Sequence, residues 1–110
     1  MENNILNDYL ENDKIDFKKI NVHINQLKVF MHPVRYAIML LLIKHKKMTV
    51  TDIYRELSIQ QAAVSNHLKL MKDSGILYSE RCGINILYSV NDQALKTLYE
   101  STKLDFIDKN

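Results

Sequence analysis

The sequence contains a single cysteine, two glycines and one proline among its 110 residues. One thiol can form neither an internal disulfide framework nor a four-cysteine zinc site. So few glycines and prolines leave little room for linkers, and the chain shows no internal repeat or low-complexity tract. We therefore expect residues 1–110 to fold as one small domain around one core.

Long hydrophobic runs are also missing. The longest, YAIMLLLI at residues 36–43, ends at Lys44 and is much shorter than the roughly 18 apolar residues of a membrane-spanning helix. The first residues, MENNILNDYLENDK, are acidic and lack the basic-then-apolar order of a secretory signal. These features predict a cytoplasmic protein with no membrane partner.

Charge is distributed unevenly, although the formal net charge is only +2. Residues 28–81 contain nine basic and four acidic side chains, whereas the flanks contain six basic and nine acidic ones. A basic centre between acidic ends suits the binding of a polyanion, because neutralising phosphates releases counterions. The alternative is an ordinary set of solvated lysines.

Capping residues predict two helices in the first half of this basic centre. One begins at Pro33 with His32 as a weak cap, and it ends within residues 44–47. The other has Thr49 as its N-cap, with Asp52 three residues later. Its predicted buried residues are Val50, Ile53 and Leu57.

A third helix is predicted from Gln61 to Ser74, ended by Gly75 in the left-handed conformation. It follows the second helix after a tight turn, and it carries an apolar stripe of Val64, Leu68 and Met71. Two helices joined in this way predict a helix-turn-helix.

A β-hairpin is predicted next, in ILYSERCGINILYSV at residues 76–90, with Gly83 at its turn. A two-stranded ribbon that follows such a helix pair in the sequence is called a wing. The strand after the turn is predicted to alternate Ile84, Ile86, Tyr88 and Val90 with Asn85, Leu87 and Ser89.

Apolar stripes at helical spacing predict further helices at both ends of the chain, the last one capped by Asn91. A shorter stripe consists of Ile5, Leu6, Tyr9 and Leu10. The terminal helices are more apolar than one small domain can cover, so we expect a homodimer; packing on the chain's own core is the alternative. The predicted interface residues are Ile20, Ile24, Leu27, Met31, Leu95, Leu98, Tyr99 and Phe106.

Three segments, in this order and spacing, resemble the ArsR/SmtB-type winged-helix transcriptional repressors. They are MHPVRYAIMLLL at residues 31–42, AAVSNHLKLMKDSGIL at 62–77 and ERCGINILYSV at 80–90. The resemblance covers roughly residues 27–90. It implies a mainly α winged helix-turn-helix with four helices, a two-stranded β-wing and a C-terminal helix. Residues 33–75 would be the helical DNA-binding core and 76–90 the wing, with 1–31 and 91–110 for dimerisation.

Polar residues on one face of the third helix are predicted to enter the major groove of double-stranded DNA. Gln61 and Asn66 can pair with adenine, Ala62 can contact a thymine methyl group, and Ser65 can bond a base edge or a phosphate. Similar proteins place DNA contacts at these positions. The predicted DNA-binding residues are Gln60, Gln61, Ala62, Ser65, Asn66, His67, Lys69, Lys72 and Arg81.

Five of these residues have more specific interpretations. Lys69 and Lys72 would contact phosphates, and Arg81 would contact a phosphate or the minor groove. His67 lies at the edge of the apolar stripe, where a packing histidine and a phosphate contact are equally good interpretations. Gln60 stands where a serine cap is usual in the family, and glutamine caps poorly.

No metal site or other cofactor is predicted, and the effector remains open. Many metal-sensing relatives have a Cys-Val-Cys-Asp-Leu box before the recognition helix, but this chain has TVTDI, with Thr49 and Thr51 at the cysteine positions. His23, His32 and His45 lack the spacing of a helical ligand pair. Cys82 is interpreted as an inert surface thiol, the alternative being a thiolate favoured by Arg81.

The predicted function is a sequence-specific transcriptional repressor that binds an inverted-repeat operator as a homodimer. The alternative is a winged-helix module that binds protein rather than specific DNA. An enzyme is discounted, because the chain has no nucleophile–base constellation and no glycine-rich phosphate loop.

Overall fold

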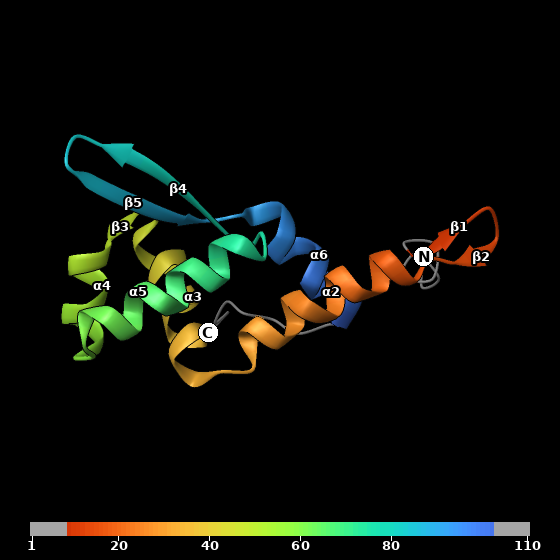
Figure 1. Ribbon diagram of the computed structural model, residues 1–110, viewed down its shortest axis with the longest axis horizontal. Coiled ribbons are helices and arrows are strands. Elements are labelled where there is room, and N and C mark those ends of the chain that lie inside the picture. Colours follow the sequence, from red (N-terminus) through yellow and green to blue (C-terminus); the bar gives the residue numbers. More distant parts are fainter. Residues whose placement is uncertain (1–8, 103–110) are drawn as a thin grey trace.

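The computed structural model describes residues 9–102 and has a mainly α architecture (Figure 1). Its helices are α2 (Phe17–Phe30), α3 (Pro33–His45), α4 (Val50–Leu57), α5 (Gln61–Asp73) and α6 (Asp92–Thr102). Strands β3 (Met48–Thr49), β4 (Leu77–Cys82) and β5 (Asn85–Val90) form one antiparallel sheet in the order β3-β5-β4. The predicted winged helix-turn-helix is confirmed, with α4 and α5 as the helix pair and β4–β5 as the wing.

Local capping bonds fix the start of three helices where the sequence predicts them. The Val34 N–H donates to His32 Nδ1 at 3.1 Å at the start of α3, and the Asp52 N–H donates to Thr49 Oγ1 at 3.1 Å at the start of α4. Asn91 Oδ1 accepts from the N–H of Ala94 at 3.3 Å at the start of α6. Each bond satisfies an amide that the first turn of a helix leaves without a partner.

The turn between α4 and α5 depends on one residue in an uncommon conformation. Ser58 has φ 56° and ends α4 in the left-handed region, which the sequence did not predict. The N–H of Ile59 donates to the carbonyl of Tyr54 at 3.2 Å across this turn. At the far end of α5, Gly75 has φ +83°, as predicted, and this conformation favours glycine.

The core lies between α3, α4, α5 and the start of the wing, and it includes the end of α2 and the inner side of α6. The apolar stripe predicted on α5 is completely buried, and Ile53 of α4 is buried against the same core. Val50 and Leu57 are half-buried. This packing fixes the orientation of α5, because a stripe buried along its length leaves the opposite face toward solvent.

The wing is a regular hairpin, and its turn contains Gly83, as predicted, together with Ile84. Leu77 pairs with Val90 at its base and Cys82 with Asn85 at its tip, so Gly83 and Ile84 form a two-residue turn. Ile84 was expected in the strand but lies in the turn and is 95% exposed. Gly83 has φ +65°, which permits such a tight turn. The pairing of β3 with β5 was not predicted from the sequence.

A small hairpin precedes α2, where a helical stripe was expected. Strands β1 (Leu10–Glu11) and β2 (Lys14–Ile15) are joined by Asn12 and Asp13, with φ 53° and 63°. Asn and Asp tolerate this left-handed conformation and favour a tight turn. This local preference outweighs the short apolar pattern that predicted a helix here. The expected helix is therefore wrong for Tyr9 and Leu10, while Ile5 and Leu6 lie outside the described residues.

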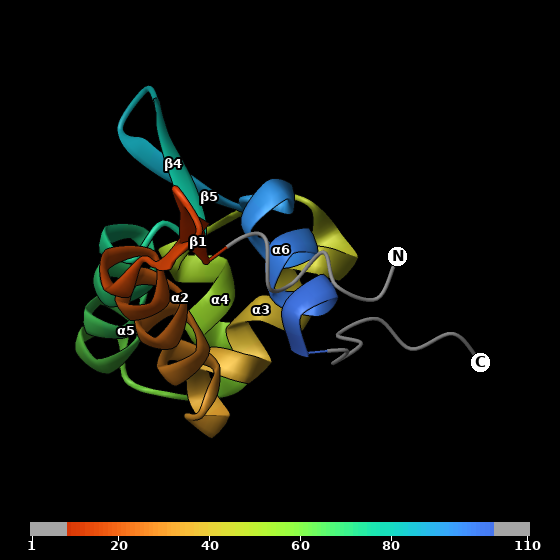
Figure 2. The ribbon, with the colours of Figure 1, turned by 90° about the vertical axis from the view of Figure 1, so that its right-hand side faces the viewer.

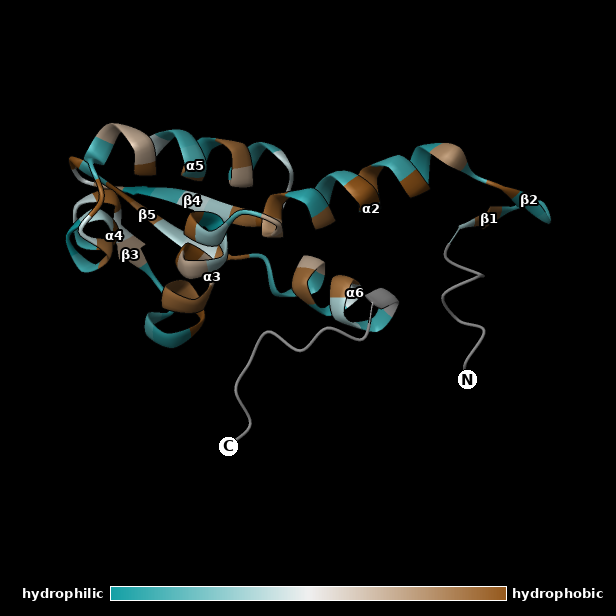
Figure 3. Cartoon of the chain, turned by 90° about the horizontal axis from the view of Figure 1, so that it is seen from below, coloured by the Kyte–Doolittle hydropathy of each residue, from teal (hydrophilic) through white to brown (hydrophobic). Residues whose placement is uncertain are grey.

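Helix α2 extends away from the helix-turn-helix and carries β1–β2 at its far end (Figure 1). Helix α6 packs beside it, and the wing rises above both helices in Figure 2. Hydrophobic residues occur along the whole length of α2 (Figure 3).

Among the described residues, no single helix is long and apolar enough to cross a membrane. Helices α2 and α3 reach that length only together, and they are bent by 90° at their break.

Candidate nucleic-acid interface

The exposed face of α5 presents polar side chains opposite a stripe that is fixed in the core. Gln61, Ala62 and Asn66 are exposed, and Ser65 is half-buried beside them. Gln60 makes no side-chain capping bond, in agreement with the poor capping expected of glutamine. The Gln60 carbonyl still accepts from the N–H of Val64 at 3.2 Å, so α5 has a regular first turn. Side chains that carry a paired donor and acceptor therefore project from a rigid helix.

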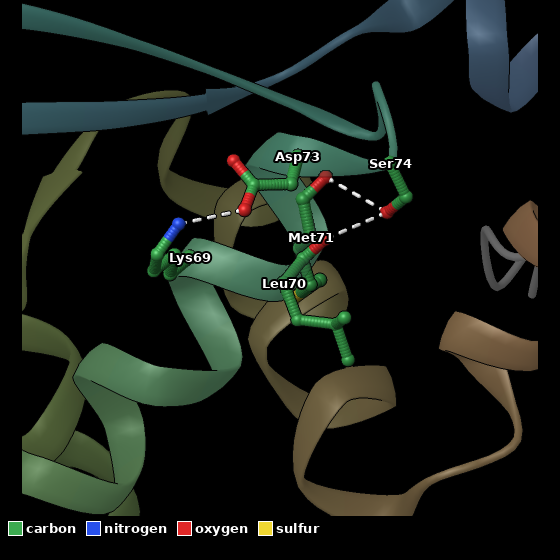
Figure 4. A network of polar contacts seen from close by, with 5 residues as sticks. All are labelled: Lys69, Leu70, Met71, Asp73 and Ser74. Carbon is green, nitrogen blue, oxygen red and sulfur yellow. Dashed lines mark hydrogen bonds and ion pairs between the residues drawn. The ribbon is translucent and has the colours of Figure 1, made fainter.

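The two lysines predicted to contact phosphate differ in their surroundings. Lys69 Nζ lies 2.8 Å from Asp73 Oδ2 one turn along α5, and this ion pair is exposed (Figure 4). The hydrogen bond to Asp73 raises the pKa of Lys69 above its usual value. Lys72 is exposed in the last turn of the same helix. The Asp73 carboxylate would therefore compete with a phosphate for the Lys69 ammonium.

His67 points into contacts between helices. Its ring centroid lies 4.5 Å from that of His32, with the planes tilted by 51°. Its Nδ1 lies 3.4 Å from Nη1 of Arg35, and the residue is half-buried. Burial, followed by the neighbouring His32 and Arg35, lowers the pKa of His67. Of the two interpretations left open by the sequence, these contacts are those of a packing histidine.

The wing carries the exposed side chain of Arg81, and an ion pair of the neighbouring Glu80 connects the wing to the segment after α3. Arg81 is exposed near the tip of β4 and is paired in register with Ile86. Lys47 Nζ lies 2.6 Å from Glu80 Oε1, and this hydrogen bond raises the pKa of Lys47. The contact joins the segment after α3 to the outer strand of the wing. The sequence did not predict it, because the partners are 33 positions apart.

The predicted dimer residues do not all lie on the surface of the chain. Ile24, Met31 and Tyr99 are exposed, and Ile20, Leu27 and Leu95 are half-buried. Leu98 is fully buried in the core of the chain itself, so its side chain has no surface left for a partner to cover. This corrects the prediction for Leu98, whose helical spacing did not distinguish the inner side of α6 from its outer side. Phe106 lies outside the described residues.

Thr49 and Thr51 stand where many metal-sensing relatives have the cysteines of their metal-binding box. Thr49 accepts the capping bond of α4, and Thr51 is half-buried in the first turn. Within residues 9–102, no three His, Cys, Asp or Glu side chains gather into a group that could hold a metal ion. Cys82 is exposed near the wing tip.

One residue in this region was missed as a functional candidate. Arg35 Nε donates to the carbonyl of Val29 at 2.7 Å, and Nη2 lies 3.5 Å from the carbonyl of Lys28. With the contact to His67, a single guanidinium joins the end of α2, the start of α3 and the middle of α5. The signal available in the sequence was its place three residues after the cap His32, in the segment that resembles the family's opening helix.

Comparison with known proteins gives concordant matches. Residues 32–79 match the family described as bacterial regulatory protein, arsR family. The chain is 37% identical over 79 residues to the transcriptional repressor PagR of Bacillus anthracis, a match that covers 72% of this chain and 79% of PagR. It is 33% identical over 85 residues to the transcriptional repressor SdpR of Bacillus subtilis, covering 77% and 92% of the two chains. The crystal structure of PagR aligns with a TM-score of 0.65 at 32% identity, covering 74% of this chain and 94% of PagR.

Proposed function

Because this chain belongs to the arsR family of bacterial regulatory proteins and is a DNA-binding transcriptional repressor, we propose that it recognises an inverted-repeat operator as a homodimer. The observation that carries this proposal is the exposed face of α5, opposite a fully buried stripe. A helix held in this way can enter a major groove and present its exposed side chains to the base edges.

Base recognition is assigned to the first two turns of α5. Gln61 and Asn66 each offer a donor and an acceptor that match adenine, and Ala62 can contact a thymine methyl group. All three side chains are exposed in the free chain. Their truncation would change sequence preference rather than general affinity for DNA.

Phosphate contacts are assigned to Lys69, Lys72 and Arg81, which lie on α5 and on the wing. Cations of this kind fix the position of a protein on the duplex without reading its sequence. Lys69 would exchange its ion pair with Asp73 for a phosphate, whereas the exposed Lys72 and Arg81 would contribute directly. Gln60 and Ser65 are assigned to contacts at the edge of the same surface.

The dimer interface is assigned to α2 and α6, which pack beside each other in one protomer. Ile24, Met31 and Tyr99 expose apolar surface that the chain itself does not cover. A two-fold arrangement would bury this surface against its copy and place two α5 helices on the same side of a duplex. Such a repressor acts where the bacterial DNA lies, so we place it in the cytoplasm.

Selection of DNA fragments from a genomic library with the full-length protein tests this function. We expect enriched fragments that share an inverted repeat with half-sites about one helical turn apart, or a multiple of that spacing. Binding to every fragment with the same affinity at each salt concentration, or to none, would contradict the proposal. Light scattering on the same sample reports whether the bound species is a dimer.

A further inference from the structure

We propose that His32, Arg35 and His67, here called the imidazole cluster, position the recognition helix α5 and release it when the cluster takes up a proton. The effect on DNA rests on the function proposed above, whereas the effect on the position of α5 does not. In this role His67 and Arg35 are positioning residues that act through the helix.

The three residues come from elements that pack against one another, since α3 contacts both α2 and α5. His32 caps α3, Arg35 lies in the first turn of α3, and His67 lies in the middle of α5. The two imidazole rings are in contact at 4.5 Å between centroids, and Nη1 of Arg35 lies 3.4 Å from His67 Nδ1. Arg35 also donates to the carbonyl of Val29, so the cluster reaches α2 as well.

Hydrogen-bond chemistry determines which nitrogen carries the proton in this arrangement. A guanidinium can only donate, so Nδ1 of His67 must accept and cannot be protonated. A backbone N–H likewise only donates, and Val34 donates to Nδ1 of His32 at 3.1 Å. In the geometry of this structure, Nδ1 of each ring is therefore placed as an acceptor. A proton on His67 Nδ1 would turn an acceptor into a donor that faces another donor.

The charges around His67 also oppose protonation. The charged and titratable groups facing it are His32 and Arg35 of α3. From α2, the backbone carbonyl of Lys28 lies 3.5 Å from Nη2 of Arg35. On its own helix, the carboxylate of Asp73 is already paired with Lys69. A protonated His67 would therefore stand beside a guanidinium with no unpaired carboxylate among the described groups that face it. Repulsion would separate α5 from the start of α3.

This role predicts the opposite pH response from direct phosphate binding by His67. If His67 contacted DNA, its protonation would add a cation and strengthen binding as the pH falls. If it positions α5, protonation disturbs the reading surface and weakens binding to the operator. The sign of the pH dependence therefore separates the two roles.

The experiment measures operator affinity of the full-length protein from pH 7.5 to 5.5 at constant ionic strength. We expect the affinity of the wild-type protein to fall as the pH decreases, by at most about tenfold per pH unit for each linked proton, and the proposed homodimer carries one His67 in each protomer. His67→Gln keeps an acceptor for Arg35 but cannot be protonated, so the fall should disappear. His45→Gln, which removes an exposed histidine at the end of α3, should retain it.

A second measurement works without DNA. Histidine ring signals and α5 backbone amides are followed by NMR in the wild-type protein over the same pH range. We expect the α5 amides to shift together with the titration of His67. Amides that do not respond, or operator affinity that rises or stays constant as the pH falls, would overturn the positioning role. If no operator is found, the proposed function fails, whereas the amide titration still decides whether the cluster positions α5.

Discussion

Arg35 and His67 are 32 positions apart in the sequence, and their side chains meet at 3.4 Å between Nη1 and Nδ1. The contact joins the first turn of α3 to the middle of the recognition helix. Beside it the rings of His32 and His67 are in contact, and Ile38 of α3 and Leu68 of α5 are completely buried in the core. The face of α5 that is exposed to solvent is therefore held from behind by packing and by one guanidinium.

The stability of the fold should decrease in mild acid. The pKa of His67 is lowered in the folded chain from its ordinary value of 6.5, so the unfolded chain binds the proton more readily. The stabilising contribution is complete above pH 6.5 and is lost as the pH falls from there through the lowered pKa. Urea unfolding at several pH values measures this loss. His67→Gln should reduce the change in unfolding free energy with pH, whereas His45→Gln should leave it unchanged. An equal pH dependence in all three proteins would contradict the prediction.

Base-reading and phosphate-contacting side chains should behave differently on substitution. Gln61→Ala and Asn66→Ala should each relax preference at particular base pairs by about 1 to 3 kcal/mol, because a paired donor and acceptor are lost. Lys72→Ala and Arg81→Ala should weaken binding to all sequences and flatten its salt dependence. Isotherms on matched and mismatched duplexes at two salt concentrations distinguish the classes. The assignment of α5 would be wrong if Gln61→Ala and Lys72→Ala behaved alike.

Removing the partner of Lys69 should strengthen binding to DNA of any sequence. Asp73→Asn removes the carboxylate that lies 2.8 Å from Lys69 Nζ, so the ammonium no longer has to leave an ion pair. The logarithmic salt dependence should become steeper by up to about one unit, the contribution of one additional phosphate contact. Asp13→Asn in the turn between β1 and β2 makes the same change in an exposed residue at the far end of α2 and serves as the control. An equal gain in both variants would indicate a general charge effect.

The surface of α2 should control assembly, and the inner side of α6 should control folding. Ile24→Glu places a charge on an exposed apolar position and should yield a folded monomer in light scattering. Ile84→Glu, the same kind of change at the wing tip, should leave the dimer intact. Leu98→Ala should instead lower the free energy of unfolding by about 2 to 5 kcal/mol, because it opens a cavity in the core. A wild-type chain that is monomeric at micromolar concentration would contradict the assignment of the interface.

Metal ions should not release the protein from its operator. Thr49 uses its hydroxyl to cap α4, and a hydroxyl is a much weaker ligand than a thiolate for soft or borderline metals. Zinc, cadmium or arsenite in modest excess should leave operator affinity unchanged in fluorescence anisotropy. Dissociation of the complex by any of them, reversed by a chelator, would show that this chain binds metal elsewhere.

The sequence by itself determined the features that depend on residues close together in the chain. His32, Thr49 and Asn91 start their helices through bonds to amides two or three positions away. Gly75 ends α5 because of its own backbone conformation. The buried stripe of α5 follows from helical period alone. These signals are local, so they were sufficient to predict the winged helix-turn-helix and the polar face of its recognition helix.

Only the tertiary structure decided which side chains from distant segments meet. Periodicity places Leu98 on an apolar side of α6, but the packing of α6 on the chain determines that this side belongs to the core. The pattern around His67 was equally compatible with DNA and with packing, until the fold brought His32 and Arg35 against its ring. The partners of Lys47 and His67 lie more than 30 positions away, where no local pattern identifies them. Such contacts depend on how whole elements pack, because burial and hydrogen bonding are satisfied by neighbours in space and not by neighbours in sequence.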